Sequence, residues 1–241
     1  MGDTITTILQ TYKRPKYLQS QIDAIKNQSM QSDDIIIVQN GEETNFNYPD
    51  DIHTIKSSEN MKFHLRFAIG LLAKTKYVCF FDDDTIPGQN WYWNCVNTIQ
   101  QTNAICVGNG RIIDINKKTW YGSGWGNPSN NITPVDFGGH VWFLKTEQLK
   151  YMWFDKIYNY NNGEDIQLSA NANIFGNIKT VVPPHPKDDK SLWSSLKGIE
   201  YGADDVASYK VNPIHFAERF ALIEEYVKKG WNLLIEHAPI S

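Results

Sequence analysis

Short apolar runs recur along the first hundred residues, and each is followed by a polar loop and a segment with helical spacing. The β-branched run Thr4–Leu9 and the run Asp34–Val38 predict two buried strands, and His53–Lys56 predicts a third, shorter one. Pro15 favours the start of a helix that ends near Gln28, and Asn60 is a suitable cap for a helix through Ala73. This alternation predicts a parallel sheet with right-handed crossovers.

The most apolar run, Tyr77–Phe81, leads directly into Asp82, Asp83 and Asp84. Such a run predicts a central, fully buried strand, and Pro87-Gly88 ends it. Side chains alternate along a strand, so Asp82 and Asp84 should point the same way and Asp83 the opposite way. Open α/β sheets bind ligands at the carboxyl ends of their strands. A divalent cation such as Mg²⁺ or Mn²⁺ would relieve the repulsion between these acids. The alternative is a solvated acidic turn.

The pattern is less regular after the Asp-rich strand. We expect a helix over 89–102, a strand over 104–107, a hairpin over 111–120 that turns at Asn116-Lys117, and an irregular Gly/aromatic loop over 121–128. The later segments are a strand over 135–144 broken by Gly138-Gly139, a helix from Gly163 to about Phe175, and a strand over 178–182.

The last part of the chain predicts one more amphipathic helix. It starts at Pro213, stops at Gly230, and offers an apolar face of Phe216, Phe220, Ile223 and Val227. The segment 187–212 before it is polar and contains glycine, which predicts a mobile loop.

Composition narrows the class of protein. Hydrophobic residues make up 41% and charged residues 21% of the 241 residues, as in an ordinary soluble globular protein. The net charge of −4 makes nucleic acid an improbable main partner. The three cysteines lack metal-binding spacing, and there is neither a signal peptide nor a transmembrane run. We therefore expect a cytoplasmic protein with reduced thiols.

Six segments in a fixed order resemble glycosyltransferases of the GT-A fold, nearest to family 2. They are TTILQTYKRP, IIIVQNG, FFDDD, GGHVWF, GED and PPHP, within residues 4–186. The resemblance implies an α/β fold with a single Rossmann-like, mixed, mostly parallel central sheet flanked by helices. It also implies one domain over 1–241, divided into a nucleotide-sugar half (1–110), an acceptor and catalytic half (111–186), the mobile loop (187–212) and a C-terminal helix and tail (213–241).

The resemblance assigns the metal and the base. Asp82-Asp83-Asp84 looks like the DXD motif, in which Asp84 binds Mn²⁺ or Mg²⁺ while Asp82 and Asp83 contact the ribose or the metal and its waters. His185 looks like the late histidine that completes the metal site. Gly163-Glu164-Asp165 looks like the xED motif, in which Asp165 is the general base. An acid at a helix N-terminus is also electrostatically favoured.

Donor and acceptor contacts follow from the same resemblance. The donor group contains Thr11, Tyr12, Arg14, Gln39, Asn40, Arg66, Asp82, Asp83 and Lys187. Gln39 or Asn40 stands where the family commonly has Asp, so the base, expected to be uracil, is left open. Gly139, Trp142 and Glu164 fall on the acceptor side, where glycine permits close approach of a sugar.

The resulting expectation is a metal-dependent, inverting glycosyltransferase of hexosyltransferase type. It would move a sugar from a nucleoside-diphosphate sugar, UDP-linked by resemblance, to a hydroxyl of a glycan or glycoconjugate. The alternatives are a retaining glycosyltransferase, a sugar nucleotidyltransferase, or a non-catalytic carbohydrate-binding module. The absence of glycine in Gln10-Thr11-Tyr12 counts against the nucleotidyltransferase, and the acids at 82–84 and 165 would have no purpose in a binding module.

Overall fold

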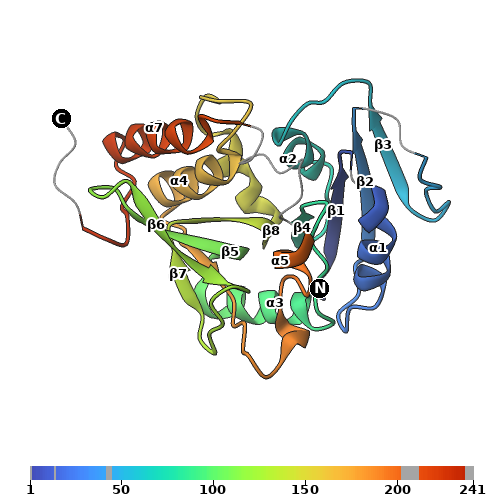
Figure 1. Cartoon of the computed structure of the whole chain (residues 1–241). Helices are drawn as coiled ribbons and strands as arrows, with labels where there is room; N and C mark the ends of the chain where they lie inside the picture. Colours follow the sequence, from blue (N-terminus) through green and yellow to red (C-terminus); the bar gives the residue numbers. More distant parts are fainter. Residues whose placement is uncertain (1, 14, 42–44, 202–211, 237–241) are drawn as a thin grey trace.

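The computed structural model describes residues 2–13, 15–41, 45–201 and 212–236 (Figure 1). These residues form a mixed, mostly parallel sheet in the order β3-β2-β1-β4-β8-β5-β9-β7, with β6 paired to β5. The strands are β1 Ile5–Thr11, β2 Asp34–Asn40, β3 His53–Ser57, β4 Tyr77–Phe81, β5 Ile105–Asp114, β6 Thr119–Gly124, β7 Thr133–Val135, β8 Phe137–Lys145 and β9 Thr180–Val182.

Helices cover both faces of the sheet. They are η1 Pro15–Tyr17, α1 Leu18–Lys26, α2 His64–Gly70, α3 Trp91–Thr102, η2 Thr146–Trp153, α4 Glu164–Gly176, η3 Lys190–Leu192, α5 Gly198–Tyr201 and α7 His215–Lys228. α1 and α3 pack with the strands in one apolar core, while α2, η2 and α4 pack in a second core. α7 lies along α4 (Figure 1). Within the described ranges, no helix is long and apolar enough to cross a membrane.

The first half of the sheet confirms the prediction of parallel pairing. β3, β2, β1 and β4 are parallel neighbours, and Leu9 of β1 pairs with Phe81 of β4. The carboxyl ends of these strands therefore share one edge of the sheet, and Asp82, the first residue after β4, lies at that edge. β8 runs antiparallel between β4 and β5, so the second half of the chain approaches the same edge from the opposite direction.

The second half of the chain confirms the predicted hairpin and corrects its neighbours. β5 and β6 pair antiparallel across a turn at 115–118, where the sequence predicts a turn at Asn116-Lys117. The strand expected over 104–107 continues into the first arm of this hairpin as β5, and the second arm, β6, extends into the predicted irregular loop. β8 is continuous through Gly138-Gly139 rather than broken. It passes a register shift in β5 between Val107 and Asn109, where a Cβ on Gly138 would overlap the Val107 side chain. Glycine here permits close packing instead of ending the strand.

The predicted mobile loop is more firmly attached than its composition indicates. The Gly88 amide donates to the Trp193 carbonyl (2.8 Å), the Leu196 amide donates to the Ile86 carbonyl (2.7 Å), and the Trp193 side chain is buried. Residues 190–196 therefore have anchoring contacts that the polar composition does not predict. Residues 202–211 lie outside the described residues, and the mobility of the segment, including its movement on nucleotide binding, stays a prediction.

The apolar face of the last helix is also shifted from the predicted one. α7 buries Arg219, Leu222, Ile223 and Tyr226, whereas Phe216 is 53% exposed. The shift places Arg219 against the body of the protein in place of Phe216, while Phe220 stays partly buried.

Candidate active site

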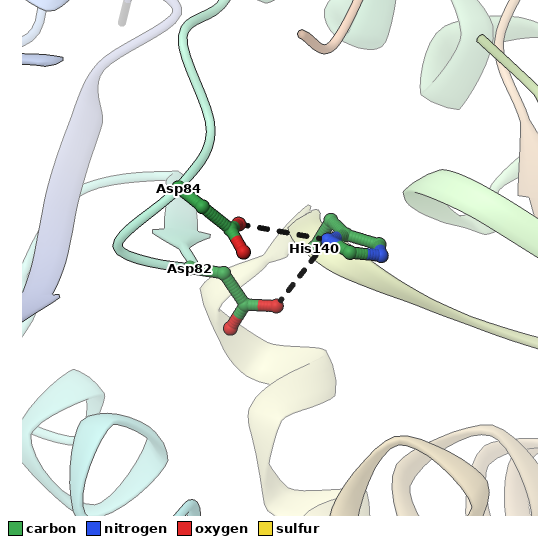
Figure 2. A group of neighbouring side chains, drawn as sticks. All are labelled: Asp82, Asp84 and His140. Atoms are coloured by element: carbon green, nitrogen blue, oxygen red, sulfur yellow. Dashed lines mark ion pairs between the residues drawn. The ribbon is translucent and has the colours of Figure 1, made fainter. Parts of the chain in front are cut away.

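The end of β4 and the start of β8 bring three metal-ligating side chains together. The Asp82 amide donates to the His140 carbonyl (2.8 Å), which extends the pairing of these strands past their apolar parts. Nδ1 of His140 lies 3.8 Å from Oδ2 of Asp82 and 3.7 Å from Oδ1 of Asp84. Figure 2 shows both carboxylates turned toward the imidazole ring. Asp82 and Asp84 thus share one side, as strand alternation predicts.

This group, Asp82, Asp84 and His140, fits a divalent cation. Its ligand atoms all lie within 4.8 Å of one another. The His140 Nδ1 atom is buried and has no hydrogen-bond partner among the described residues, and its separations from the carboxylates are too long for hydrogen bonds. Such spacing suits atoms that each bind one ion at about 2 Å. Oxygen and imidazole ligands are compatible with Mn²⁺.

The backbone and the charges around His140 support this role. His140 has a left-handed φ of 69°, an uncommon conformation for a residue other than glycine, and this conformation turns its ring toward the acids. Burial opposes protonation of the ring, but Asp84 and then Asp82 outweigh burial and raise the pKa of His140. A bound cation would compete with that proton.

His185, the histidine expected at the metal, is not in this group. Its Nδ1 lies 2.8 Å from the Pro183 carbonyl and its Nε2 lies 2.9 Å from the Ser194 hydroxyl. The side chain is 1% exposed, and burial lowers the pKa of His185 to about 4. Both ring nitrogens are therefore occupied in joining β9 to the following segment. The structure corrects this assignment, with His140 in the place expected for His185.

Arg66 of α2 connects the metal-ligating group to the start of α4. Its guanidinium forms an ion pair with Asp82 and a longer one, at 3.4 Å, with Glu164. Burial opposes the charge of Arg66, but these acids outweigh it and raise the pKa. The guanidinium carbon lies 4.6 Å above the Trp142 ring, which is only 1% exposed. The prediction that Trp142 contacts an acceptor sugar is therefore wrong, because its ring is buried below Arg66.

Asp165 is held in the first turn of α4. Its Oδ1 accepts from the Ile166 amide (2.8 Å), and its Oδ2 pairs with Arg219 of α7 (2.7 Å). Arg219 also donates to the Asn162 side chain (3.1 Å). A Cβ on Gly139 would lie 3.8 Å from Oδ2 of Asp165, so glycine leaves room beside this oxygen.

Glu164 stands next to Asp165 and is equally buried. Burial, followed by the charge of Asp165, raises the pKa of Glu164 to about 7, although Arg66 and Arg219 act in the opposite direction. Glu164 therefore exchanges a proton near neutral pH, and the site contains two adjacent acids with different electrostatic environments.

The predicted donor residues at the ends of β1 and β2 lie at the same sheet edge. The Tyr12 amide donates to Oδ2 of Asp83 (3.3 Å), so Asp83 points toward the end of β1. The Asn40 side chain bonds the Met61 amide (2.8 Å) and the Lys62 carbonyl (2.8 Å). The remaining positions are Thr11 and Gln39, both buried, Lys187, exposed, and Arg14, which lies outside the described residues. Recognition of the base by this group stays a prediction.

Sequence reasoning missed two residues of the site. His140 follows Gly138-Gly139, and only the pairing of β8 with β4 brings it to the acids. Its signal is a polar residue directly after a glycine pair in an otherwise apolar strand. Arg219 lies 54 positions after Asp165, and its signal is a cation within the apolar face of a helix.

Comparison with known proteins gives one match. The model of a family described as Glycosyl transferase family 2 matches residues 6–160, more than half of the chain. A search of curated proteins found no match. The matched residues include Arg66, Asp82, Asp84 and His140, and they end at residue 160, within the loop that leads to α4 and Asp165.

Proposed function

Because the chain belongs to glycosyl transferase family 2, and is therefore a glycosyltransferase with the GT-A fold, we propose that it is a metal-dependent, inverting enzyme. Its donor is a nucleoside-diphosphate sugar, with UDP as the nucleotide, and its acceptor is a hydroxyl of a glycan or glycoconjugate. The observation that carries this proposal is the arrangement of two acidic centres on one side of the sheet. Arg66 bridges them through Asp82 and Glu164.

The first centre faces the leaving group. Asp82, Asp84 and His140 would hold Mn²⁺ or Mg²⁺, and the bound cation supplies stabilisation of the negative charge that collects on the departing diphosphate. Arg66 fixes the carboxylate of Asp82 through their ion pair. This pair orients the ligand before substrate arrives, which lowers the cost of organising the site.

The second centre activates the acceptor. Asp165 accepts the proton of the acceptor hydroxyl as that oxygen forms a bond to the anomeric carbon of the donor. The bond between the anomeric carbon and the diphosphate oxygen breaks in the same step, and its electron pair leaves with the diphosphate. A single displacement inverts the anomeric configuration. The room beside Oδ2 of Asp165, left by Gly139, supports approach of the acceptor from this direction.

Membership of an enzyme family removes the non-catalytic binding module and the sugar nucleotidyltransferase from the alternatives. A retaining mechanism is the alternative that the experiment has to exclude. Retention would need a mechanism other than a single inverting displacement, so the anomeric configuration of the product distinguishes the two directly.

The test is Asp165→Asn, measured with Mn²⁺ and a panel of UDP-sugars. The amide keeps the shape of the carboxylate but cannot accept a proton, so transfer should fall about 10²–10⁴-fold. Binding of UDP with Mn²⁺ should match the parent protein, since the nucleotide is held at the first centre. Asp50→Asn, in an exposed loop, is the matched control and should transfer normally. Full transfer by Asp165→Asn, or a product with the donor's configuration, would refute the mechanism.

A further inference from the structure

Arg111 of β5 lies on the sheet face that carries Asp165. It pairs with Phe137 of β8 and with Gly122 of β6, and paired residues of antiparallel strands point to the same face. The guanidinium carbon of Arg219 lies 5.1 Å above the Phe137 ring on that face. Arg111 therefore projects toward the layer of α4 and α7, in which Asp165 begins α4.

The sheet around Arg111 has few side chains on this face. Its partner Gly122 is exposed, and a Cβ there would lie 3.4 Å from Nη1 of Arg111. Two residues earlier, Asn109 pairs with Gly124 on one side and Gly139 on the other. Gly139 is also the residue that leaves room beside Asp165. The three glycines thus place no side chains beside Arg111 and Asn109 on this face of the sheet.

Only one nitrogen of the Arg111 guanidinium donates hydrogen bonds to described residues. Its Nη1 donates to the Asn109 side chain (2.9 Å) and to the Gly110 carbonyl (2.8 Å). Within the described part of the chain, Nε and Nη2 have no acceptor, and no carboxylate lies within ion-pair distance. Arg66 and Arg219, the other arginines near the two acidic centres, both form ion pairs with acids. Arg111 is the exception.

Partial burial makes the charge of Arg111 unfavourable without an ion-pair partner. Burial and then the charge of Arg219 lower the pKa of Arg111, while Asp165 acts in the opposite direction. Arg111 also acts on His140 of the metal-ligating group. The arginine therefore acts on charged groups of both centres, is partly removed from water, and carries a charge that no direct ion pair with a described residue balances. Cations in such positions favour an anionic partner.

We propose that Arg111 and Asn109 form a subsite for the carboxylate of a hexuronic acid, carried by the transferred sugar or by the acceptor sugar at Asp165. This inference rests on the proposed function and names its substrate class. Nε and Nη2 form the edge of a guanidinium that binds a carboxylate with two parallel hydrogen bonds. Because Asp165 already balances Arg219, one positive charge is left, which matches a carboxylate better than the nearly doubly charged phosphate.

The experiment compares uronate and neutral probes in two arms by calorimetric titration with Mn²⁺. The donor arm uses UDP, UDP-glucose and UDP-glucuronic acid. The acceptor arm uses methyl glucoside and methyl glucuronide added to the UDP-bound protein. In one arm the parent protein should bind the uronate at least tenfold more tightly than the neutral sugar, and that arm identifies which substrate carries the carboxylate.

Variants connect the preference to Arg111. Arg111→Gln should weaken uronate binding about ten- to a hundredfold, the range for a lost charged hydrogen-bonding pair, and leave the neutral probe within about threefold. Arg111→Lys keeps the charge but not the paired geometry, so it should restore only part of the preference. Lys117→Gln removes an exposed charge from the β5–β6 turn and is the matched control.

Two results would overturn the inference while the proposed function stands. One is equal affinity of the parent protein for uronate and neutral probes in both arms, a result that does not depend on how well any variant folds. The other is a loss of affinity for UDP alone in Arg111→Gln as large as the loss for the uronate, which would assign Arg111 to the diphosphate. Failure of the proposed function is different: the parent protein would bind none of the UDP ligands with Mn²⁺, and the inference would fall with it.

Discussion

The metal-ligating group and the base region hold their charges at different distances. Nδ1 of His140 stays 3.7 Å from its nearer carboxylate, whereas Arg219 touches Asp165 at 2.7 Å. Ligands that share one cation at about 2 Å lie roughly 3–4 Å apart, so the first spacing leaves room for an ion. The second spacing leaves none, because Arg219 contacts the oxygen of Asp165 directly. At the first centre Arg66 pairs with Asp82, but His140 forms no hydrogen bond with either carboxylate. We conclude that metal should affect donor binding and have little effect on the geometry of the base.

The two regions also come from different parts of the chain. Arg66, Asp82 and His140 lie within the residues that match the family, whereas Asp165 and Arg219 lie beyond residue 160. Arg219 belongs to α7, the last helix described. The proposed metal site therefore lies within the matched residues, and the support of the proposed base comes from an element outside them.

Arg219→Gln should have the largest effect, because it disrupts the base region and leaves the metal-ligating group in place. The substitution leaves the carboxylate of Asp165 buried without its cation, and removing one partner of a buried ion pair costs about 3–5 kcal/mol of stability. Urea unfolding without metal measures this loss, and transfer should fall because the base is no longer held. Mn²⁺-dependent binding of UDP should persist below the melting temperature, since the metal-ligating group does not contact α7.

The double variant Arg219→Gln/Asp165→Asn separates stability from chemistry. Neutralising both partners removes the unpaired buried charge, so much of the lost stability should return while transfer stays low. This is the behaviour of a coupled pair in a double-mutant cycle. Additive losses of stability in the two single variants would show that Arg219 and Asp165 are not coupled, and that α7 supports the base in some other way.

The sequence predicts the regular part of the molecule well. Tyr77–Phe81 is a five-residue apolar run with acids at its end, and such local patterns determine a buried strand and the direction of its polar tip. The parallel order of β1, β2 and β4 follows from the alternation of strands and helices. The family resemblance is confirmed by the family match, which includes four of its six motifs; GED and PPHP lie beyond residue 160.

What the sequence does not predict depends on contacts between distant residues. His140 approaches Asp82 only because β8 inserts antiparallel beside β4, and His185 attracts attention only by its place in a proline-rich motif. Arg219 was missed because the predicted apolar face of α7 is displaced by about one residue. That face includes Phe216 and Phe220, whereas the buried face contains Leu222 and Ile223. Periodicity defines a helix face only to within about one residue, and an error of one residue is enough to leave Arg219 off the predicted buried face.

Glu164→Gln tests the electrostatics of the base region with a smaller effect. Burial raises the pKa of Glu164 from 4.5 to about 7, so the folded protein holds a proton that the unfolded chain releases at lower pH. Between pH 5 and 8 the parent protein should therefore lose up to about 3 kcal/mol of stability relative to the variant. Below pH 4.5 both states hold the proton, and above pH 8 the difference should be constant.

Urea unfolding at several pH values, without Mn²⁺, measures this dependence. The matched control is Glu147→Gln, which removes the same charge from an exposed position and should leave the pH dependence of the parent unchanged. A parent protein whose stability relative to Glu164→Gln is the same at pH 5 and pH 8 would mean that Glu164 titrates like an exposed glutamate, with water reaching the space between Arg66 and Asp165.

Substitutions of the two histidines give the last test. The sequence assigns the metal to His185, whereas the structure places His140 beside the two carboxylates. His140→Ala removes a proposed ligand, so the affinity of the UDP-bound protein for Mn²⁺ should fall at least about tenfold, in line with roughly 1.4 kcal/mol or more. Its melting temperature without metal should change little, because Nδ1 has no hydrogen bond to lose among the described residues.

His185→Ala should behave in the opposite way. It removes hydrogen bonds to Pro183 and Ser194, which should cost about 1–3 kcal/mol of stability and leave Mn²⁺ affinity unchanged. Loss of Mn²⁺ affinity in His185→Ala with normal affinity in His140→Ala would return the metal to the histidine that the motif favoured.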